Sequence, residues 1–235
     1  MVFLTIGLKK DSVYIIVPIF NEGLTARKVV SSLLEYGFSV IVVDDASADN
    51  SYDSIKDLDI HYLQHEVNLG QGAAIQTGIE YALTKNDATI FATFDGDGQH
   101  RVEDLAEIIK PVEKNEADIV MGSRFLPGAF SNASFIRKVA IQTARVINFL
   151  FTGLWLTDAH NGLRVFNRKT ASLLDLKENG MAHASEILFR VAKYKIRFKE
   201  MPVHILYTEY SKKKGQSIFS GIKIFFDLVF NRIFD

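Results

Sequence analysis

The sequence predicts an α/β protein with a Rossmann-like, mostly parallel sheet and helices on both faces. β-Branched runs, polar or glycine-rich loops and helical stretches alternate through the first half of the chain, as they do in parallel α/β proteins. The composition agrees, because 235 residues with 48% hydrophobic and 23% charged side chains suit one large domain with a sizeable core. The polar loops directly follow the strands, which is where ligands bind in such sheets.

The elements follow from β-branched runs and from helical periodicity. Strands are expected at residues 13–18, 39–43, 60–63 and 117–121, with a further strand starting at Thr89. Helices are expected from Leu24 to a stop at Gly37, in a short stretch ending at Leu58, at residues 73–83, and around Glu186.

The strand that starts at Thr89 ends abruptly at D-G-D-G-Q-H, two carboxylates separated by one glycine. The glycines let the backbone turn sharply, so Asp95 and Asp97 converge outside the sheet. Mg²⁺ and Mn²⁺ prefer oxygen ligands and are commonly held by one or two carboxylates together with substrate phosphates. Gln99 and His100 add further ligand-capable groups. The alternative is an ordinary turn with Asp and Gly in their usual places.

Polar loops follow four of the expected strands and should meet at one rim of the sheet. They are residues 18–22, Asp44 with Asp45, residues 68–72 and residues 95–100. Each alone is more typical of a turn or a helix cap, but their joint occurrence predicts a nucleotide site. A dinucleotide-binding fold is disfavoured, because the first strand is followed by P-x-x-N-E and not by G-x-G-x-x-G.

Composition excludes several classes of protein. A net charge of −1 gives no support for sequence-independent nucleic-acid binding. The absence of cysteine excludes disulfides, thiolate metal sites and a cysteine nucleophile, and it fits a reducing compartment, so the cytoplasm is the default location. Residues 1–8 are expected to form a tail or an edge strand, since the lysine pair follows their apolar run where a signal peptide would place it first. No window has the roughly 18 apolar residues of a spanning helix.

Two amphipathic stretches mark the second half of the chain. Residues 139–156 carry an apolar face that core packing explains. Residues 218–235 carry a stripe with four phenylalanines, which either docks onto the preceding amphipathic helix, mediates dimerisation or lies with that helix in a membrane interface. We therefore divide the chain into a catalytic domain at residues 1–217 and a C-terminal amphipathic helix at residues 218–235.

The ordered motifs carry a family resemblance. P-I-F-N-E, V-V-D-D-A-S-A-D, N-L-G-Q-G, D-G-D-G-Q-H, G-S-R and D-A-H-N-G-L-R-V-F occur in this order between Val13 and Ser217. The set resembles the family-two inverting glycosyltransferases, which have the GT-A fold. Within them it is most similar to the polyprenyl-phosphate sugar transferases of the dolichol-phosphate mannose synthase type.

The resemblance implies a role for each matched residue. Nucleotide-sugar binding falls to Pro18, Asn21, Glu22, Asp44, Asp45, Gly70, Gly72, Asp95, Gly96 and Lys212, the last standing where relatives have arginine. Asp97 and Gln99 would hold Mg²⁺ or Mn²⁺ on the diphosphate. Arg124 and Arg137 would grip the acceptor phosphate, and Asp158 would lie on the acceptor side. Glu186 is kept as the general base in case the acceptor is a hydroxyl.

The implied activity is an inverting, metal-dependent transfer of a sugar from a UDP- or GDP-type donor to a polyprenyl phosphate, undecaprenyl or dolichyl, at the inner face of a membrane. Peripheral membrane contact is expected, and homo-oligomers are compatible with it. The alternative is transfer to a hydroxyl of a lipid-linked or cell-surface glycan. A more distant alternative is a non-catalytic module that binds sugar nucleotides, although simple binding does not demand the whole set of carboxylates. A sugar-nucleotide pyrophosphorylase is disfavoured, because no G-x-G-T-R-like loop follows the first strand.

Overall fold

The computed structural model describes residues 12–207. Three expectations therefore lie outside the described residues: the tail or edge strand at residues 1–8, the loop with Lys212, and the amphipathic helix at residues 218–235. The proposed boundary at residue 217 also falls there and stays a prediction.

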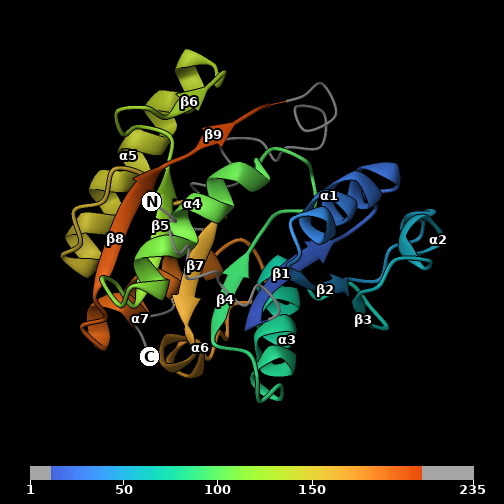
Figure 1. The fold of residues 1–235 in the computed structure, drawn as a ribbon. Helices are drawn as coiled ribbons and strands as arrows, with labels where there is room; N and C mark the ends of the chain where they lie inside the picture. Colours follow the sequence, from blue (N-terminus) through green and yellow to red (C-terminus); the bar gives the residue numbers. More distant parts are fainter. Residues whose placement is uncertain (1–11, 208–235) are drawn as a thin grey trace, which may run out of the picture.

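A seven-stranded sheet forms the centre of the molecule (Figure 1), with the strand order β3-β2-β1-β4-β7-β5-β8. Its strands are β1 (Val13–Ile19), β2 (Ser39–Asp44), β3 (His61–Gln64), β4 (Ile90–Thr93), β5 (Ile119–Ser123), β7 (Arg164–Asn167) and β8 (Phe198–Pro202). All neighbours are parallel except that β7 runs antiparallel to both β4 and β5. The mostly parallel sheet is thus confirmed, whereas β7 is a strand that the sequence pattern did not predict.

Helices cover both faces of the sheet, as predicted. They are α1 (Leu24–Glu35), α2 (Ser51–Ile55), α3 (Gln71–Leu83), α4 (Val102–Glu113), α5 (Phe135–Thr152), α6 (Arg168–Leu174) and α7 (His183–Lys193). Alternate residues of β1 point to opposite faces, so Ile15 packs with α1 and α4 while Ile16 packs with α3, α6 and α7. A small second sheet pairs β6 (Phe130–Ser131) with β9 (His204–Ile205).

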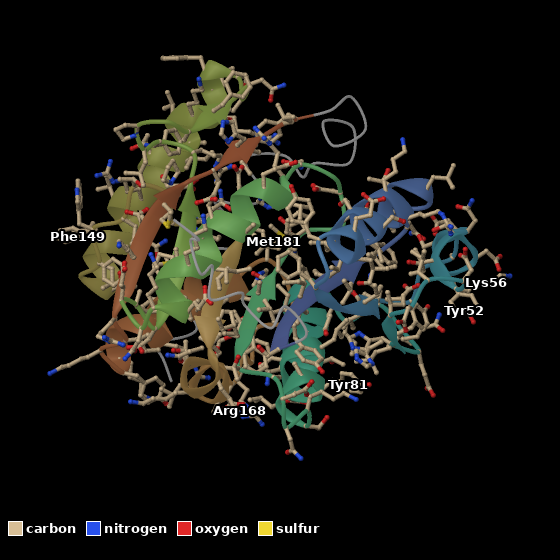
Figure 2. All side chains as sticks on the ribbon, viewed as in Figure 1. Tyr52, Lys56, Tyr81, Phe149, Arg168 and Met181 are labelled. Carbon is tan, nitrogen blue, oxygen red and sulfur yellow. The ribbon has the colours of Figure 1, made fainter. Side chains whose placement is uncertain are left out.

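The prediction that core packing explains the apolar face of residues 139–156 is wrong. This stretch belongs to α5, which lies at one edge of the molecule (Figure 1), and the buried residue of that helix is the polar Asn148. Leu150 is 73% exposed and Trp155, just beyond the helix, is 56% exposed. Figure 2 shows Phe149 projecting outward at this edge. Helical periodicity identifies an apolar face but does not say what covers it.

Within residues 12–207, no helix combines the length and the apolar character needed to span a bilayer.

Candidate active site

The loops that follow β1, β2 and β4 meet at one rim of the sheet, as predicted. Asn21 joins the first two loops, because its N–H donates to Ser47 Oγ at 2.9 Å and its Oδ1 accepts from the N–H of Ala48 at 2.8 Å. Gln71, at the start of α3, reaches the loop after β4, because its Nε2 donates to Asp95 Oδ1 at 2.8 Å. The rim is therefore one hydrogen-bonded structure.

A hollow of about 450 Å³ opens at the carboxyl ends of β2 and β3. Its lining consists of Ala46, Ser47, Gln64, His65 and Glu66. Ala46 has a φ of 63°, in the left-handed region that costs a non-glycine residue about 1–3 kcal/mol. Strain of this kind gathers at functional sites, and the volume lies within the usual range of small-molecule sites.

The carboxylate of Asp44 holds Ser47, one of the residues that line this hollow, in place. The side chain is fully buried, its Oδ1 accepts from the N–H of Ser47 at 2.8 Å, and its Oδ2 accepts from the hydroxyl of Tyr62 at 2.9 Å. Burial and the neighbouring carboxylate raise the pKa of Tyr62 well above its ordinary value, so it stays a proton donor. Both oxygens of Asp44 thus accept from protein groups, and its expected contact with base or ribose stays a prediction.

Asp45 likewise organises the rim. Its Oδ1 accepts from the N–H of Leu69 at 2.9 Å and lies 2.7 Å from His65 Nδ1, and its Oδ2 accepts from the N–H of Gly70 at 2.6 Å. His65 Nε2 is in turn 3.0 Å from Thr77 Oγ1 on α3. Asp45 is 3% exposed and fixes the glycine loop, and its expected contact with the nucleotide stays a prediction.

The glycine loop needs its glycines for a backbone contact. A Cβ at Gly72 would lie 2.0 Å from the carbonyl oxygen of Glu178, and one at Gly70 would lie 2.4 Å from that of Asn179. The N–H of Gly72 donates to the same Asn179 carbonyl at 2.7 Å. Both glycines therefore lie against residues 178–180, and their expected place beside the nucleotide stays a prediction.

The predicted D-x-D pair lies at the end of β4. Asp95 is held by Gln71 and by His100 Nε2, 3.2 Å from its Oδ2, and a Cβ at Gly162 would lie 2.3 Å from the same oxygen. Burial opposes ionisation of Asp95, but His100, with the positive charges of His183 and Arg164, outweighs it and lowers its pKa. A side chain at Gly96 would meet the end of β1, 3.1 Å from the carbonyl of the buried Pro18, so the turn approaches that strand closely.

Asp97 carries charge that its protein neighbours do not neutralise. Its Oδ1 accepts from the N–H of Gln99 at 3.0 Å and its Oδ2 accepts from Gln99 Nε2. Burial, then the charge of Asp95, and more weakly that of Glu22, raise the pKa of Asp97 to about 6. Among residues 12–207, no group of three or more histidine, aspartate and glutamate side chains forms a complete metal cage. The D-x-D pair of Asp95 and Asp97 fits a hard divalent cation that takes its remaining ligands from phosphate oxygens.

Arg124 and Arg137 both contact Tyr207, and all three residues lie outside the D-x-D loop. Arg124 Nη1 donates to the hydroxyl of Tyr207 at 2.7 Å, and the Arg137 guanidinium lies 4.6 Å from the centre of the same ring. Arg124 also binds Asp158 in a two-point ion pair, with Nε to Oδ2 at 2.6 Å and Nη2 to Oδ1 at 2.7 Å. Glu200 fixes Asp158 from the other side by accepting its N–H at 3.1 Å.

The ion pair decides what Asp158 can do. Burial disfavours both charges, yet the mutual attraction outweighs it, so the pKa of Asp158 is lowered and that of Arg124 is raised. With both oxygens on Arg124 and the side chain inaccessible to solvent, Asp158 orients the arginine and is poorly placed to take a proton from an acceptor.

Glu186 lies in the first turn of α7 and also has its oxygens occupied. Oε2 accepts from the N–H groups of Lys177 and Glu178, each at 2.9 Å, and Oε1 accepts from Arg190 at 3.0 Å. Glu186 is buried, with 3% of the residue exposed to solvent. This geometry disfavours Glu186 as a general base, a role that was expected only for a hydroxyl acceptor and that stays a prediction.

Two further histidines have limited exposure: His183 is buried and His160 is half-buried. His160 Nε2 is 3.3 Å from Ser185 Oγ, and His183 Nδ1 donates to the carbonyl of Gly180 at 2.8 Å. Burial lowers the pKa of each to about 4, with help from the positive charge of Arg164, which is itself buried and donates to backbone carbonyls.

The two histidines should make folding stability rise between about pH 4 and pH 6.5, which outweighs the smaller opposite contribution of Asp97. Across this window the unfolded histidines, with a pKa of 6.5, bind more protons than the folded ones, so acid favours unfolding by up to about 3 kcal/mol per histidine. Urea denaturation at pH 4.5 and pH 7.5 should show this loss. The substitution His160→Gln should remove about half of it, whereas an unchanged pH slope in that variant would contradict the assignment.

Several contributing residues escaped the sequence reasoning. Arg164 lies within the D-A-H-N-G-L-R motif and so carries some signal, whereas Tyr207 lies in none of the motifs. His65 and Glu200 belong to no motif, and only the fold brings them to the rim.

Comparison with known proteins agrees with this geometry. Residues 14–174 match the model of Glycosyl transferase family 2. The chain is 33% identical to a UDP-N-acetylglucosamine–dolichyl-phosphate N-acetylglucosaminyltransferase of Methanococcus voltae, covering 92% of this chain and 94% of that one. It is 29% identical to an undecaprenyl-phosphate mannosyltransferase of Micrococcus luteus, covering 88% and 86%.

A solved structure shares the fold. Glucosyl-3-phosphoglycerate synthase of Mycobacterium tuberculosis, crystallised with Mn²⁺, UDP and glucosyl-3-phosphoglycerate, aligns with a TM-score of 0.66 at 15% identity, over 85% of this chain and 72% of that one. Because the family model spans more than half of the sequence and the sheet has the expected architecture, this chain belongs to glycosyl transferase family 2 and is a glycosyltransferase with the GT-A fold.

Proposed function

We propose that this enzyme transfers a sugar, with inversion, from a nucleotide diphosphate to a polyprenyl phosphate at the inner face of a membrane, and that it requires Mg²⁺ or Mn²⁺. The observation that carries the proposal is the pair of guanidinium groups on Tyr207. Arg124 is oriented by Asp158, and Arg137 lies against the same ring. Planar guanidinium donors suit a phosphate, and relatives are named for polyprenyl-phosphate acceptors.

The state of the carboxylates favours a phosphate acceptor over a hydroxyl. A hydroxyl nucleophile needs a general base within hydrogen-bond reach, yet Asp158 and Glu186 both direct their oxygens to protein donors. A phosphate monoester carries about −1.5 to −2 charges near neutral pH and needs positioning more than deprotonation. Direct attack by the phosphate oxygen on the anomeric carbon displaces the nucleotide diphosphate in one step, and a single displacement inverts that carbon.

The donor side is supported by the hollow beside Ala46 and by the D-x-D pair. The hollow has the size of a nucleoside site, and the Methanococcus relative is named for a UDP-sugar, which favours UDP over GDP. Asp97 and Gln99 would hold the divalent cation, which when bound neutralises charge on the departing diphosphate. Asp95, fixed by Gln71 and His100, adds a preorganised carboxylate beside it.

Membrane contact is supported by the exposed face of α5. Phe135 is 80% exposed, Leu150 73% and Trp155 56%, and Lys138 adds positive charge near the helix start. Apolar and aromatic side chains beside basic ones are typical of helices that lie in a membrane interface. Arg137 belongs to the same helix, so a lipid-linked phosphate would arrive where the guanidinium groups lie. The absence of cysteine fits a reducing location.

Replacing Leu150 with glutamate is expected to weaken binding to anionic phospholipid vesicles about 10-fold, because a charge would replace an exposed apolar side chain that becomes buried in the bilayer on binding. Vesicle sedimentation measures the bound fraction. Leu24→Glu is the matched control, since Leu24 is 64% exposed on α1 and should leave binding unchanged. Equal binding by wild-type protein and both variants would contradict the membrane role of α5.

Product analysis tests the proposal as a whole. The protein is incubated with undecaprenyl phosphate, Mn²⁺ and a panel of UDP- and GDP-sugars carrying a radiolabel, and the organic extract is separated by thin-layer chromatography. We expect one labelled sugar lipid that forms with a matching donor and disappears with EDTA. Consumption of donor without a labelled lipid, or label on a glycan hydroxyl, would count against a phosphate acceptor.

A further inference from the structure

We propose that Glu186 is a positioning residue that acts through residues 175–180 to hold the nucleotide-binding rim in place. The inference rests on the proposed function and assigns Glu186 a part on the donor side of the reaction. Residues 175–180, here called the brace segment, connect α6 to the stretch before α7 and lie against the glycine loop at the start of α3.

Glu186 fixes the middle of the brace segment. Its Oε2 accepts from the N–H groups of Lys177 and Glu178, so one buried carboxylate satisfies two consecutive backbone donors. Arg190, one turn further along α7, donates to Oε1 of Glu186 at 3.0 Å and also to the carbonyl of Asp175. Hydrogen bonds to a charged acceptor are about twice as strong as neutral ones, which makes this a stiff attachment.

The brace segment in turn sets the position of the glycine loop. The carbonyl oxygen of Asn179 accepts from the N–H groups of Gly72 and Ala73, at 2.7 and 3.1 Å. These are first-turn donors of α3, which have no partner within the helix, so the brace segment caps that helix. A second tie lies one turn later, where Gln76 Oε1 accepts from the N–H of Leu176 at 2.8 Å.

The glycine loop connects the brace segment to the D-x-D pair and to the hollow. Gln71 directly precedes the capped Gly72 and donates to Asp95, and the N–H of Gly70 donates to Asp45 beside the hollow. A shift of the brace segment would therefore move a donor to the D-x-D pair and the wall of the hollow together. Neither contact involves Arg124 or Arg137, so the shift should affect binding of the nucleotide sugar and not binding of the acceptor.

The test compares three variants with the wild type by calorimetric titration of UDP and of GDP, each with Mn²⁺. Glu186→Gln removes the negative charge and replaces one of the two acceptor oxygens with an N–H donor, so the side chain can no longer accept from both Arg190 and the two N–H groups. It should weaken nucleotide binding about 10-fold. Gly72→Ala places a Cβ 2.0 Å from the carbonyl of Glu178, pushes the same segment away and should have a similar effect. Because both act on one contact, the double variant should bind no more than about 20-fold more weakly than wild type, well short of the roughly 100-fold of independent sites.

A steady-state measurement separates positioning from general loss of structure. We expect KM for the nucleotide sugar to rise about 10-fold in Glu186→Gln while KM for undecaprenyl phosphate stays unchanged. Glu107→Gln, on the exposed face of α4, is the matched control and should equal wild type. Arg190→Lys, a milder change, keeps the test open if Glu186→Gln does not fold, and it should raise the donor KM about 3-fold.

The outcomes distinguish this inference from the proposed function. Wild-type protein that binds UDP or GDP while the folded Glu186→Gln binds equally well would overturn the role of Glu186 and leave the proposed function standing. Equal rises in both KM values would do the same. Wild-type protein that binds neither nucleotide with Mn²⁺ would overturn the proposed function, and this inference with it.

Discussion

Replacing Asp97 with asparagine is expected to abolish turnover and, in metal-free buffer near neutral pH, to stabilise the protein. Turnover should fall by about 10³-fold or more, because the variant loses the carboxylate that would hold the cation on the departing diphosphate. The gain in stability follows from the raised pKa of Asp97, about 6 in the folded protein against an ordinary 3.8, caused first by burial and then by Asp95.

The sign of the pH dependence follows from proton binding. Between pH 3.8 and 6 the folded state binds more protons at Asp97 than the unfolded state does, so this residue lowers stability as pH rises, and the full cost remains above pH 6. Allowing for solvent around a partly exposed side chain, the cost is about 1–2 kcal/mol. Asparagine carries no such cost.

Thermal unfolding with EDTA measures the effect of this substitution. Asp97→Asn should melt higher than wild type at pH 7.5, by an amount that shrinks toward pH 4, while Asp59→Asn, which changes an exposed carboxylate, should not. Adding Mn²⁺ and UDP should raise the melting temperature of the wild type and leave the variant unchanged. A variant that melts lower than wild type at pH 7.5 would contradict the electrostatic account. A variant that retains full turnover would contradict the role assigned to Asp97.

The second large effect is expected at the Arg124–Asp158 pair. Arg124→Ala would leave the carboxylate of Asp158 buried at 1% exposure without its partner, and breaking a buried ion pair in this way costs about 3–5 kcal/mol. Adding Asp158→Asn removes the stranded charge, so the double variant should recover part of the loss. Urea denaturation of the two single variants and the double variant gives the coupling energy, and simple additivity of the single losses would contradict the pairing.

The substitution Arg124→Lys tests whether Arg124 binds the acceptor phosphate while the fold is kept. Lysine keeps the positive charge but not the planar two-point geometry, so the fold should survive while kcat/KM for undecaprenyl phosphate falls about 100-fold. Nucleotide binding should stay at the wild-type level. A variant with normal acceptor kinetics would show that Arg124 does not contact the acceptor phosphate.

The general architecture and the rim were predictable because they depend on local patterns. Alternating β-branched runs and helical stretches located β1 to β5 to within about two residues, and in a parallel sheet the loops after those strands must share an edge. The D-x-D pair at Asp95 and Asp97 was recognisable from two carboxylates and a glycine at the end of a buried strand.

The role of individual carboxylates was not predictable, because a sequence does not show whether an oxygen faces a ligand or a backbone N–H. The carboxylate of Asp45 meets His65, and that of Asp158 meets Arg124, through contacts between residues 20 and 34 positions apart in the chain. Gly72 illustrates the same limit. Its motif indicates a close approach, but only the fold shows that the carbonyl of Glu178 is one approaching group.

Phosphorus NMR of the running reaction tests the central claim most directly. With Mg²⁺, a matching sugar nucleotide and undecaprenyl phosphate, the phosphomonoester resonance of the lipid should convert to a phosphodiester at the rate at which nucleoside diphosphate appears. The anomeric coupling of the product should show a configuration opposite to that of the donor. Accumulation of nucleoside diphosphate while the monoester resonance persists would contradict the claim that this site joins a sugar to a lipid phosphate.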